Sequence, residues 1–336
     1  MARALRVEYP GARYHLMCRG NQSRNIFLAQ PDADLFIRTL GEMCVRNEVR
    51  IHAWCLMSNH YHLLAETPAG NLVDAMKWFQ GTFTQRYNAR HKLWGHLFQG
   101  RYKAKVVDDG NPDYYRAVGD YIHLNPSATG LVRQGGLAAW PWSSYPLYLT
   151  GPSTRPDWLV VDDMLSACGI PKDSPVGRQA YASRMELRHQ EVVAFKKGDP
   201  AAREWAQMER GWVHGGETFR QRMIECLAED DATSLCRVGD REQKRDLGEA
   251  AAKAVMDRCL GHFGIAREEL PRLPKSDPRK MLVAGLLRYR FPVTAAWLGE
   301  VLCMGHYTTI SRAMRFFDDP GAEWIADKEQ ILKFTG

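Results

Sequence analysis

Hydrophobic positions between Tyr14 and Pro126 switch repeatedly between the spacing of strands and that of helices. Short apolar or alternating runs predict strands at residues 14–19, 51–57, 60–66 and 103–107. Apolar residues three and four apart predict helices at residues 32–47, 71–90 and 112–124. The order of the first six elements is that of a ferredoxin-like fold, with one antiparallel sheet and two helices on one face. The chain is therefore predicted to be α+β here, with helix 112–124 added near the third strand.

The rest of the chain is predicted to be irregular at first and then all-α. Glycine, proline and tryptophan are frequent in residues 127–160, which indicates an irregular segment that closes the first domain. Helical spacing follows, interrupted by one polar stretch. The predicted organisation is a first domain at residues 1–150, a helical connecting region at 151–230, a linker at 231–246 and a helical domain at 247–330.

The most informative chemical pattern is the pair His60 and His62 in the predicted third strand. Side chains alternate between the two faces of a strand, so both imidazoles project from one face. An unpaired imidazole in an apolar strand is costly, which favours a shared ligand over two core histidines. The pair is therefore predicted to bind a divalent metal ion.

The helix that contains Tyr121 supplies matching chemistry. Tyr121 and Asn125 are four residues apart and share one face of the predicted helix, whereas His123 points away and is expected to be structural or DNA-facing. Pro126 is expected to end the helix just beyond Asn125. Asn125 is the candidate for a third, oxygen ligand. Two imidazoles with an amide oxygen suit Mg²⁺ or Mn²⁺ better than a closed zinc site.

These residues together predict covalent attack on a phosphodiester. A metal ion would polarise the scissile phosphate while the Tyr121 oxygen attacks phosphorus. The products are a phosphotyrosine bond to the 5′ side and a free 3′-hydroxyl. Because the bond energy is kept in the covalent link, strand transfer needs no ATP. Tyr114 and Tyr115 are rival nucleophiles, and spacing alone does not exclude Tyr114.

Ordered motifs between residue 3 and about residue 150 resemble the single-tyrosine HUH transposases of the IS200-like class, specifically the REP-associated tyrosine transposases. The motifs are Arg19-Gly20-Asn21-Gln22 with Ile26-Phe27, Met57-Ser58-Asn59-His60-Tyr61-His62, Phe98-Gln99-Gly100-Arg101-Tyr102-Lys103, Tyr121-Ile122-His123-Leu124-Asn125-Pro126 and Trp142-Ser143-Ser144-Tyr145. The resemblance implies that His60 and His62 bind the metal, that Tyr121 is the nucleophile and that Asn125 is the polar metal ligand.

The same resemblance implies a DNA substrate. It implies single-stranded hairpins of palindromic repeats as the partner, bound through phosphate and nearby contacts. The candidate contacts are Arg19, Asn21, Arg101, Lys103 and Lys105. Tyr61 departs from the bulky hydrophobic residue that the family usually has between the two histidines.

The C-terminal helices are similar to a second kind of DNA-binding module. Short helices are predicted at residues 278–289, 295–302 and 307–317, with Thr294 as a cap and Gly305 in the last turn. Residues 305–313 resemble the helix-turn-helix domain of the replication initiator DnaA, without the acidic and histidine positions that read bases there. The candidates for contact with duplex DNA are His306, Thr308, Thr309 and Arg312.

The distribution of charge indicates which half of the chain binds DNA, and the cysteine content indicates the cellular compartment. Residues 1–150 contain 17 Lys and Arg against 11 Asp and Glu, and residues 151–336 contain 28 against 28, so the basic excess lies with the histidine pair. Eight scattered cysteines without a C-x-x-C pair predict reduced thiols, and no apolar run approaches bilayer length. We expect a cytoplasmic, nucleoid-associated protein with no membrane partner, either a monomer or a homodimer.

The sequence thus predicts a metal-dependent transposase-type enzyme that nicks and rejoins single-stranded DNA, with an accessory helix-turn-helix. Two alternatives remain. In one, Tyr121 only packs and the protein is a hydrolytic metallonuclease. In the other, the protein is a DNA-binding regulator whose catalytic domain is vestigial.

Overall fold

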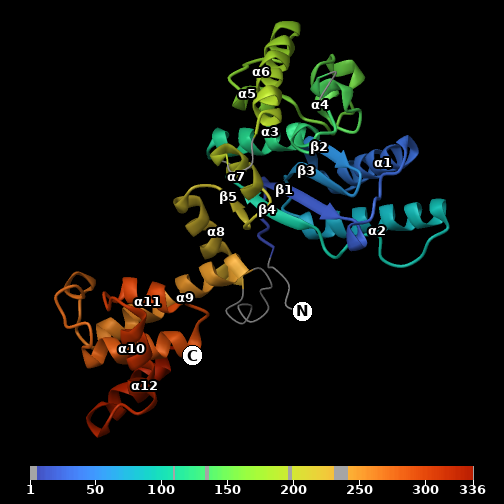
Figure 1. The fold of residues 1–336 in the computed structure, drawn as a ribbon. Coiled ribbons are helices and arrows are strands. Elements are labelled where there is room, and N and C mark those ends of the chain that lie inside the picture. Colours follow the sequence, from blue (N-terminus) through green and yellow to red (C-terminus); the bar gives the residue numbers. More distant parts are fainter. Residues whose placement is uncertain (1–5, 109, 133–135, 196–198, 231–240, 336) are drawn as a thin grey trace. The chain divides into compact units, whose positions relative to one another are not determined.

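The computed structural model describes residues 6–108, 110–132, 136–195, 199–230 and 241–335. Residues 6–221 form one compact unit and the described residues from 222 onward form a second, so that the boundary falls inside one helix, α8 (Glu217–Asp230). Figure 1 shows the two units and their elements. None of the helices in the described ranges is long and apolar enough to cross a membrane.

A five-stranded sheet forms the centre of the first unit. The strands are β1 (Ala12–Arg19), β2 (Arg50–Met57), β3 (His60–Thr67), β4 (Lys103–Val107) and β5 (Val213–His214). Their order is β2-β3-β1-β4-β5, and the first three pairs of neighbours are antiparallel, which confirms the predicted ferredoxin-like sheet. β5 pairs parallel with β4 and departs from that prediction. A strand of two residues has no period for a sequence pattern to reveal.

The helices of this unit are α1 (Gln30–Asn47), α2 (Leu72–His91), α3 (Pro112–Ala128), α4 (Tyr145–Tyr148), α5 (Asp162–Ala167), α6 (Pro175–Val193) and α7 (Pro200–Gln207). Helices α1 and α2 cover one face of the sheet, where Tyr61 of β3 packs against Phe36 and Phe79. Helix α3 covers the other face (Figure 1), where His62 packs against Tyr121. Because successive strand residues point to opposite faces, Tyr61 enters the core and the neighbouring histidines face α3.

The segment that follows α3 packs around it. Leu159 and Ser143 form bridges with Ile51 and Cys55, so this segment lies along the edge strand β2. Helix α6 packs on α3 through an ion pair of 2.5 Å between Arg184 and Asp120. Helices α5, α6 and α7 therefore belong to the same compact unit as the sheet.

Helices alone form the described part of the second unit after α8: α9 (Arg241–His262), α10 (Pro278–Arg290), α11 (Ala295–Val301), α12 (Tyr307–Asp318) and α13 (Ile325–Leu332). The predicted linker at 231–246 lies partly outside the described residues, and residues 241–246 begin α9. Gly305 turns the chain between α11 and α12 with φ +76°, a conformation that glycine adopts without strain. A Cβ at Gly299 would lie 2.5 Å from the Gly305 carbonyl oxygen, so the close approach of these helices requires glycine there.

Candidate active site

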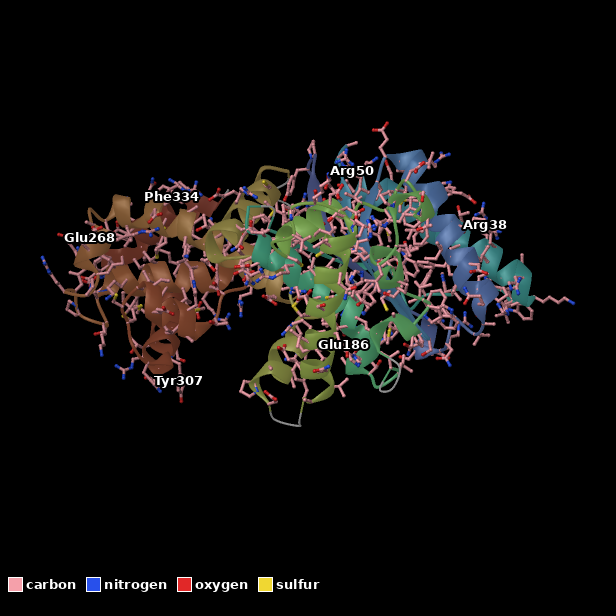
Figure 2. All side chains as sticks on the ribbon, turned by 90° about the horizontal axis from the view of Figure 1, so that it is seen from above. Arg38, Arg50, Glu186, Glu268, Tyr307 and Phe334 are labelled. Carbon is pink, nitrogen blue, oxygen red and sulfur yellow. The ribbon has the colours of Figure 1, made fainter. Side chains whose placement is uncertain are left out.

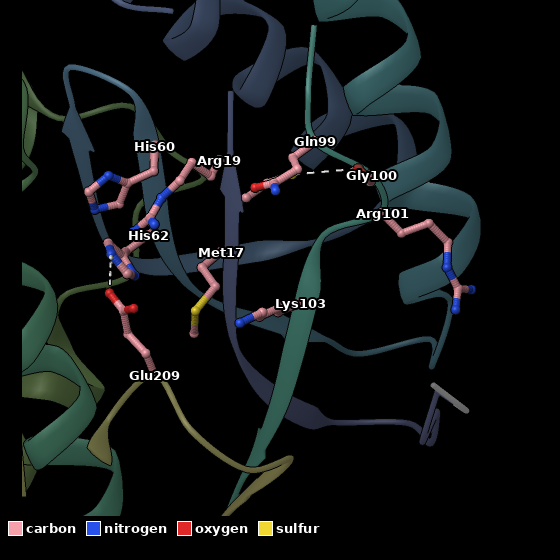
Figure 3. A pocket seen from close by; sticks show the side chains of 10 residues that line it. Met17, Arg19, His60, His62, Gln99, Gly100, Arg101, Lys103 and Glu209 are labelled. Carbon is pink, nitrogen blue, oxygen red and sulfur yellow. Dashed lines mark hydrogen bonds and ion pairs between the residues drawn. The ribbon is translucent and has the colours of Figure 1, made fainter. Parts of the chain in front are cut away.

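A pocket of about 240 Å³ opens at the edge of the sheet where β1 ends and where β3 and β4 begin. Figure 3 shows the histidine pair and Glu209 on one side of it, with Lys103 across from them. The lining residues are Met17, Cys18, Arg19, His60, His62, Gln99, Gly100, Arg101, Lys103 and Glu209. The pocket thus brings together both predicted metal-binding histidines and three of the predicted DNA contacts.

Strand β3 places His60 and His62 side by side, with ring centroids 5.0 Å apart. Burial lowers the pKa of His62 well below its usual value. Burial lowers the pKa of His60 to about 4, and Arg19, its cross-strand neighbour, contributes in the same direction. Both imidazoles are therefore neutral at physiological pH, the state in which histidine binds a metal ion.

Three buried histidines from three strands form a chain of ring contacts that ends at the pocket. Nδ1 of His62 lies 3.0 Å from Nε2 of His15, and Nδ1 of His15 lies 3.3 Å from Nε2 of His214. If each ring donates through Nδ1, Nε2 of His62 keeps its lone pair. Within the described residues this buried nitrogen has no hydrogen-bond partner. A hydrogen bond from the other ring nitrogen is what orients metal-binding histidines, so the chain favours the tautomer that a metal requires.

Glu209, which the sequence analysis did not single out, completes this group. It follows α7, and its Oε1 lies 4.0 Å from Nε2 of His62 (Figure 3). One ligand atom each from His60, His62 and Glu209 lies within 4.8 Å of the other two. By their chemistry, two neutral imidazoles and a carboxylate fit a divalent cation. No local motif marks Glu209, because it is far along the chain from the histidines and comes to them only through folding.

Helix α3 presents Tyr121 to the same group. Its hydroxyl donates to Oε1 of Glu209 at 3.0 Å, and its ring meets His62 edge-on. The Trp205 ring packs against it at 4.8 Å, which leaves Tyr121 only 3% exposed. Burial and the charge of Glu209 raise the pKa of Tyr121 above its usual value. The phenol is therefore protonated at neutral pH and must lose its proton to act as a nucleophile.

The rival tyrosines of α3 lie elsewhere. Tyr115 is buried under the Arg13 guanidinium and against His52. Tyr114 precedes Tyr121 by two helical turns, about 10 Å along the axis. The geometry therefore favours Tyr121 over its two neighbours as the nucleophile.

Asn125 lies one turn after Tyr121, and its side chain hydrogen-bonds with the phenol, which opposes the rise in the pKa of Tyr121. The expectation that Pro126 ends the helix is wrong, because α3 continues to Ala128. The Ser127 hydroxyl lies 2.7 Å from Nδ1 of His189 on α6. Packing against α6 thus stabilises a last turn that proline alone disfavours.

Of the two roles open to His123, the structure supports the structural one. The ring is fully buried, with Nδ1 2.9 Å from the Tyr181 hydroxyl and Nε2 2.8 Å from the Ser144 hydroxyl. Burial lowers the pKa of His123 to about 3. His123 therefore holds α3 to α6 and to the segment along β2.

We expect the protein to lose stability as the pH falls below about 6.5, the usual histidine pKa. The unfolded chain then binds a proton at His123, whereas the folded protein does so only near pH 3. The stability present above the unfolded pKa is lost across this window, by up to about 1.4 kcal/mol per pH unit for such a group. Thermal unfolding followed by circular dichroism should give a flatter pH dependence for His123→Gln than for the wild type. Equal slopes would contradict the assignment.

The predicted DNA contacts of the sheet domain fall into two groups. Arg19, Arg101 and Lys103 are exposed at the pocket, and Asn21 is partly exposed directly after β1. Lys105, predicted to be a phosphate contact, is buried. It is only 2% exposed, and its ammonium donates to the backbone carbonyls of Met208 and Arg210. The structure therefore does not support Lys105 as a phosphate contact, because a later segment of the chain covers it.

The polar candidates on α12 lie away from the core of their unit. His306, Thr308 and Arg312 are exposed and Thr309 is half-buried, whereas the buried residues of this helix are Ile310, Ala313 and Phe317. Figure 2 shows Tyr307, at the start of the helix, projecting outward. Helix α12 therefore offers a polar face for contact, and its role in DNA binding stays a prediction.

Comparisons with known proteins found one family model and several solved structures similar to parts of this chain. Residues 8–125 match the model of the IS200-like transposases. The solved structure of a REP-associated tyrosine transposase bound to a REP hairpin aligns with a TM-score of 0.39 and 18% identity, over 48% of this chain and 92% of that one. A putative transposase from Deinococcus radiodurans R1 aligns with a TM-score of 0.27 and 20% identity, over 34% and 90%. No curated protein matches the chain. Residues 8–125, which are fewer than half of the chain, are thus similar to the IS200-like transposases.

Proposed function

We propose that this protein nicks single-stranded hairpin DNA and transfers the strand through a 5′-phosphotyrosine intermediate, with a divalent metal ion as cofactor. The observation that carries the proposal is that the Tyr121 ring packs against His62, which lines the pocket together with His60. A phenol whose ring touches one of two neutral imidazoles is placed for attack on a phosphate that the pocket holds.

The cofactor would be Mg²⁺ or Mn²⁺, held by His60 and His62, and it would polarise a non-bridging oxygen of the scissile phosphate. The Tyr121 oxygen forms a bond to phosphorus while the bond from phosphorus to the 3′-oxygen breaks. The phenolic proton goes to Glu209, which already accepts its hydrogen bond, and the leaving 3′-oxygen takes a proton from solvent. Asn125 stabilises the developing phenolate through its own hydrogen bond. A second 3′-hydroxyl can reverse these steps and complete strand transfer.

The DNA strand would lie across the mouth of the pocket. Arg19, Arg101 and Lys103 place positive charge there, where it can neutralise phosphates on either side of the nick. Asn21, just after β1, lies within the same stretch of chain as Arg19. The polar face of α12, with His306, Thr308, Thr309 and Arg312, would contact duplex DNA beside the hairpin.

The test compares a single-stranded palindromic hairpin with the same sequence as a perfect duplex, with Mg²⁺ or Mn²⁺ present and after chelation by EDTA. The proposal predicts a nick in the hairpin that needs the metal, with little cleavage of the duplex. Equal cleavage of both substrates would favour a general metallonuclease. Tight binding of the hairpin without any nick would favour a DNA-binding regulator.

A further inference from the structure

We infer that Glu209 is an anionic ligand of the metal site beside His60 and His62, and that Lys105 holds it in position. The inference rests on the proposed function, because it concerns the same site. It assigns a metal ligand to a segment that lies outside residues 8–125, and it adds this ligand to the role predicted for Asn125.

The ligand atoms are spaced for a single ion. Donors at about 2.1 Å from a divalent cation lie about 3 to 4 Å from one another, depending on the angle between them. Oε1 of Glu209 lies 4.0 Å from Nε2 of His62, and one atom from each of the three residues falls within 4.8 Å of the others. The carboxylate is 39% exposed and can close the remaining gap by a small rotation. Nε2 of His62, which has no hydrogen-bond partner among the described residues, gains a partner in this arrangement.

The buried side chain of Lys105 holds the backbone on both sides of Glu209. The buried ammonium of Lys105 donates to the carbonyls of the residues directly before and after Glu209, Met208 and Arg210. A few residues later the chain joins the sheet, where Val106 donates to the Trp212 carbonyl and Asp108 donates to the His214 carbonyl. Because the backbone is fixed on both sides of Glu209, the side chain of Glu209 is directed to one position beside His62.

Residues 209–214 contribute two side chains to the surroundings of His62, namely Glu209 and His214. His214 of β5 closes the chain of rings that runs through His15 to His62, and Glu209 faces His62 from the pocket side. Nδ1 of His62 therefore contacts His15, and Nε2 of His62 faces Glu209. The Glu209 carboxylate adds an anionic oxygen donor to two imidazole nitrogens, a donor set that suits Mg²⁺ or Mn²⁺.

The test measures Mn²⁺ binding to the full chain without DNA, by calorimetry. Glu209→Gln keeps the size of the side chain and removes its charge, and it should weaken Mn²⁺ binding about 10- to 100-fold. Glu186→Gln, which removes an equal charge from the exposed surface of α6, should leave binding unchanged. Unfolding temperatures of both variants establish that each is folded.

Lys105→Met tests the positioning role. We expect it to weaken Mn²⁺ binding in the same direction as Glu209→Gln, while the salt dependence of hairpin binding stays that of the wild type. Loss of a phosphate contact would instead lower the slope of log affinity against log salt by about 1. Such a lowered slope would contradict the positioning role and restore Lys105 as a DNA contact.

Two outcomes separate this inference from the proposed function. If Glu209→Gln binds Mn²⁺ as the wild type does, while His62→Ala or Asn125→Ala does not, the ligand role of Glu209 is wrong and the proposed function stands. If the wild-type chain binds no Mn²⁺ and nicks no hairpin, the proposed function falls together with the inference.

Discussion

Replacing His62 with alanine is expected to lower the rate of hairpin nicking about 10³-fold or more, and to remove most of the affinity for Mn²⁺. A bound cation contributes several kcal/mol of charge stabilisation to such a transition state, and each 1.4 kcal/mol corresponds to a factor of ten in rate. His62 is 1% exposed and its Nδ1 lies 3.0 Å from Nε2 of His15, so the ring is fixed with Nε2 directed to the proposed metal site. Single-turnover cleavage at saturating metal measures the effect.

A histidine outside the site provides the control. His96 is exposed in the loop after α2, and His96→Ala should nick at the wild-type rate. His60→Ala should share the defect of His62→Ala, because its ring lies 5.0 Å from that of His62 on the same strand. A His62→Ala protein that nicks within a few-fold of the wild type would show that the pair is part of the core and has no role in the reaction.

Replacing Tyr121 with phenylalanine is expected to reduce nicking about 10⁴-fold or more, because no other group replaces a lost nucleophile. The substitution keeps the ring that packs against Trp205 and His62 and removes only the hydroxyl. The lost hydrogen bond to Glu209 should change the free energy of unfolding by only about 1 kcal/mol. Cleavage rates and unfolding temperatures measured together separate the two effects.

Tyr114→Phe is the matched control on the same helix, because it removes a hydroxyl two helical turns before Tyr121. It should nick within a few-fold of the wild type. Loss of nicking in Tyr114→Phe with activity retained in Tyr121→Phe would transfer the role of nucleophile to Tyr114. Full activity in both variants would favour hydrolysis by a metal-activated water.

The sheet domain could be predicted because its signals are local. The alternation in β3 places Tyr61 in the core and His60 and His62 on the other face, and a strand of eight residues carries that pattern clearly. Ser58 and Asn59 mark the hairpin, and the spacing of Tyr121 and Asn125 places both on one side of α3. Each of these inferences needs only residues that are neighbours in the sequence.

The parts of the site that the sequence did not reveal depend on contacts between distant segments. Glu209 and His214 reach the pocket because a two-residue strand pairs with β4 and because Lys105 binds the backbone beside Glu209. The sequence alone indicates that Lys105 is an exposed cation, whereas in the folded protein the segment around Glu209 covers it. The extension of α3 beyond Pro126 has the same origin, since packing against α6 outweighs the local preference of proline. Local sequence propensity does not include these contacts between distant segments.

The proposed reaction forms a covalent bond between Tyr121 and the 5′ side of the nick. The most direct test incubates the wild type and Tyr121→Phe with hairpins that are labelled either at the 5′ or at the 3′ end, in the presence of Mg²⁺ or Mn²⁺, and separates the products on a denaturing protein gel. The account predicts that the protein band carries the label that lies 3′ of the nick, only in the wild type and only with metal. Cleavage that leaves no label on the protein and is unchanged in Tyr121→Phe would contradict it.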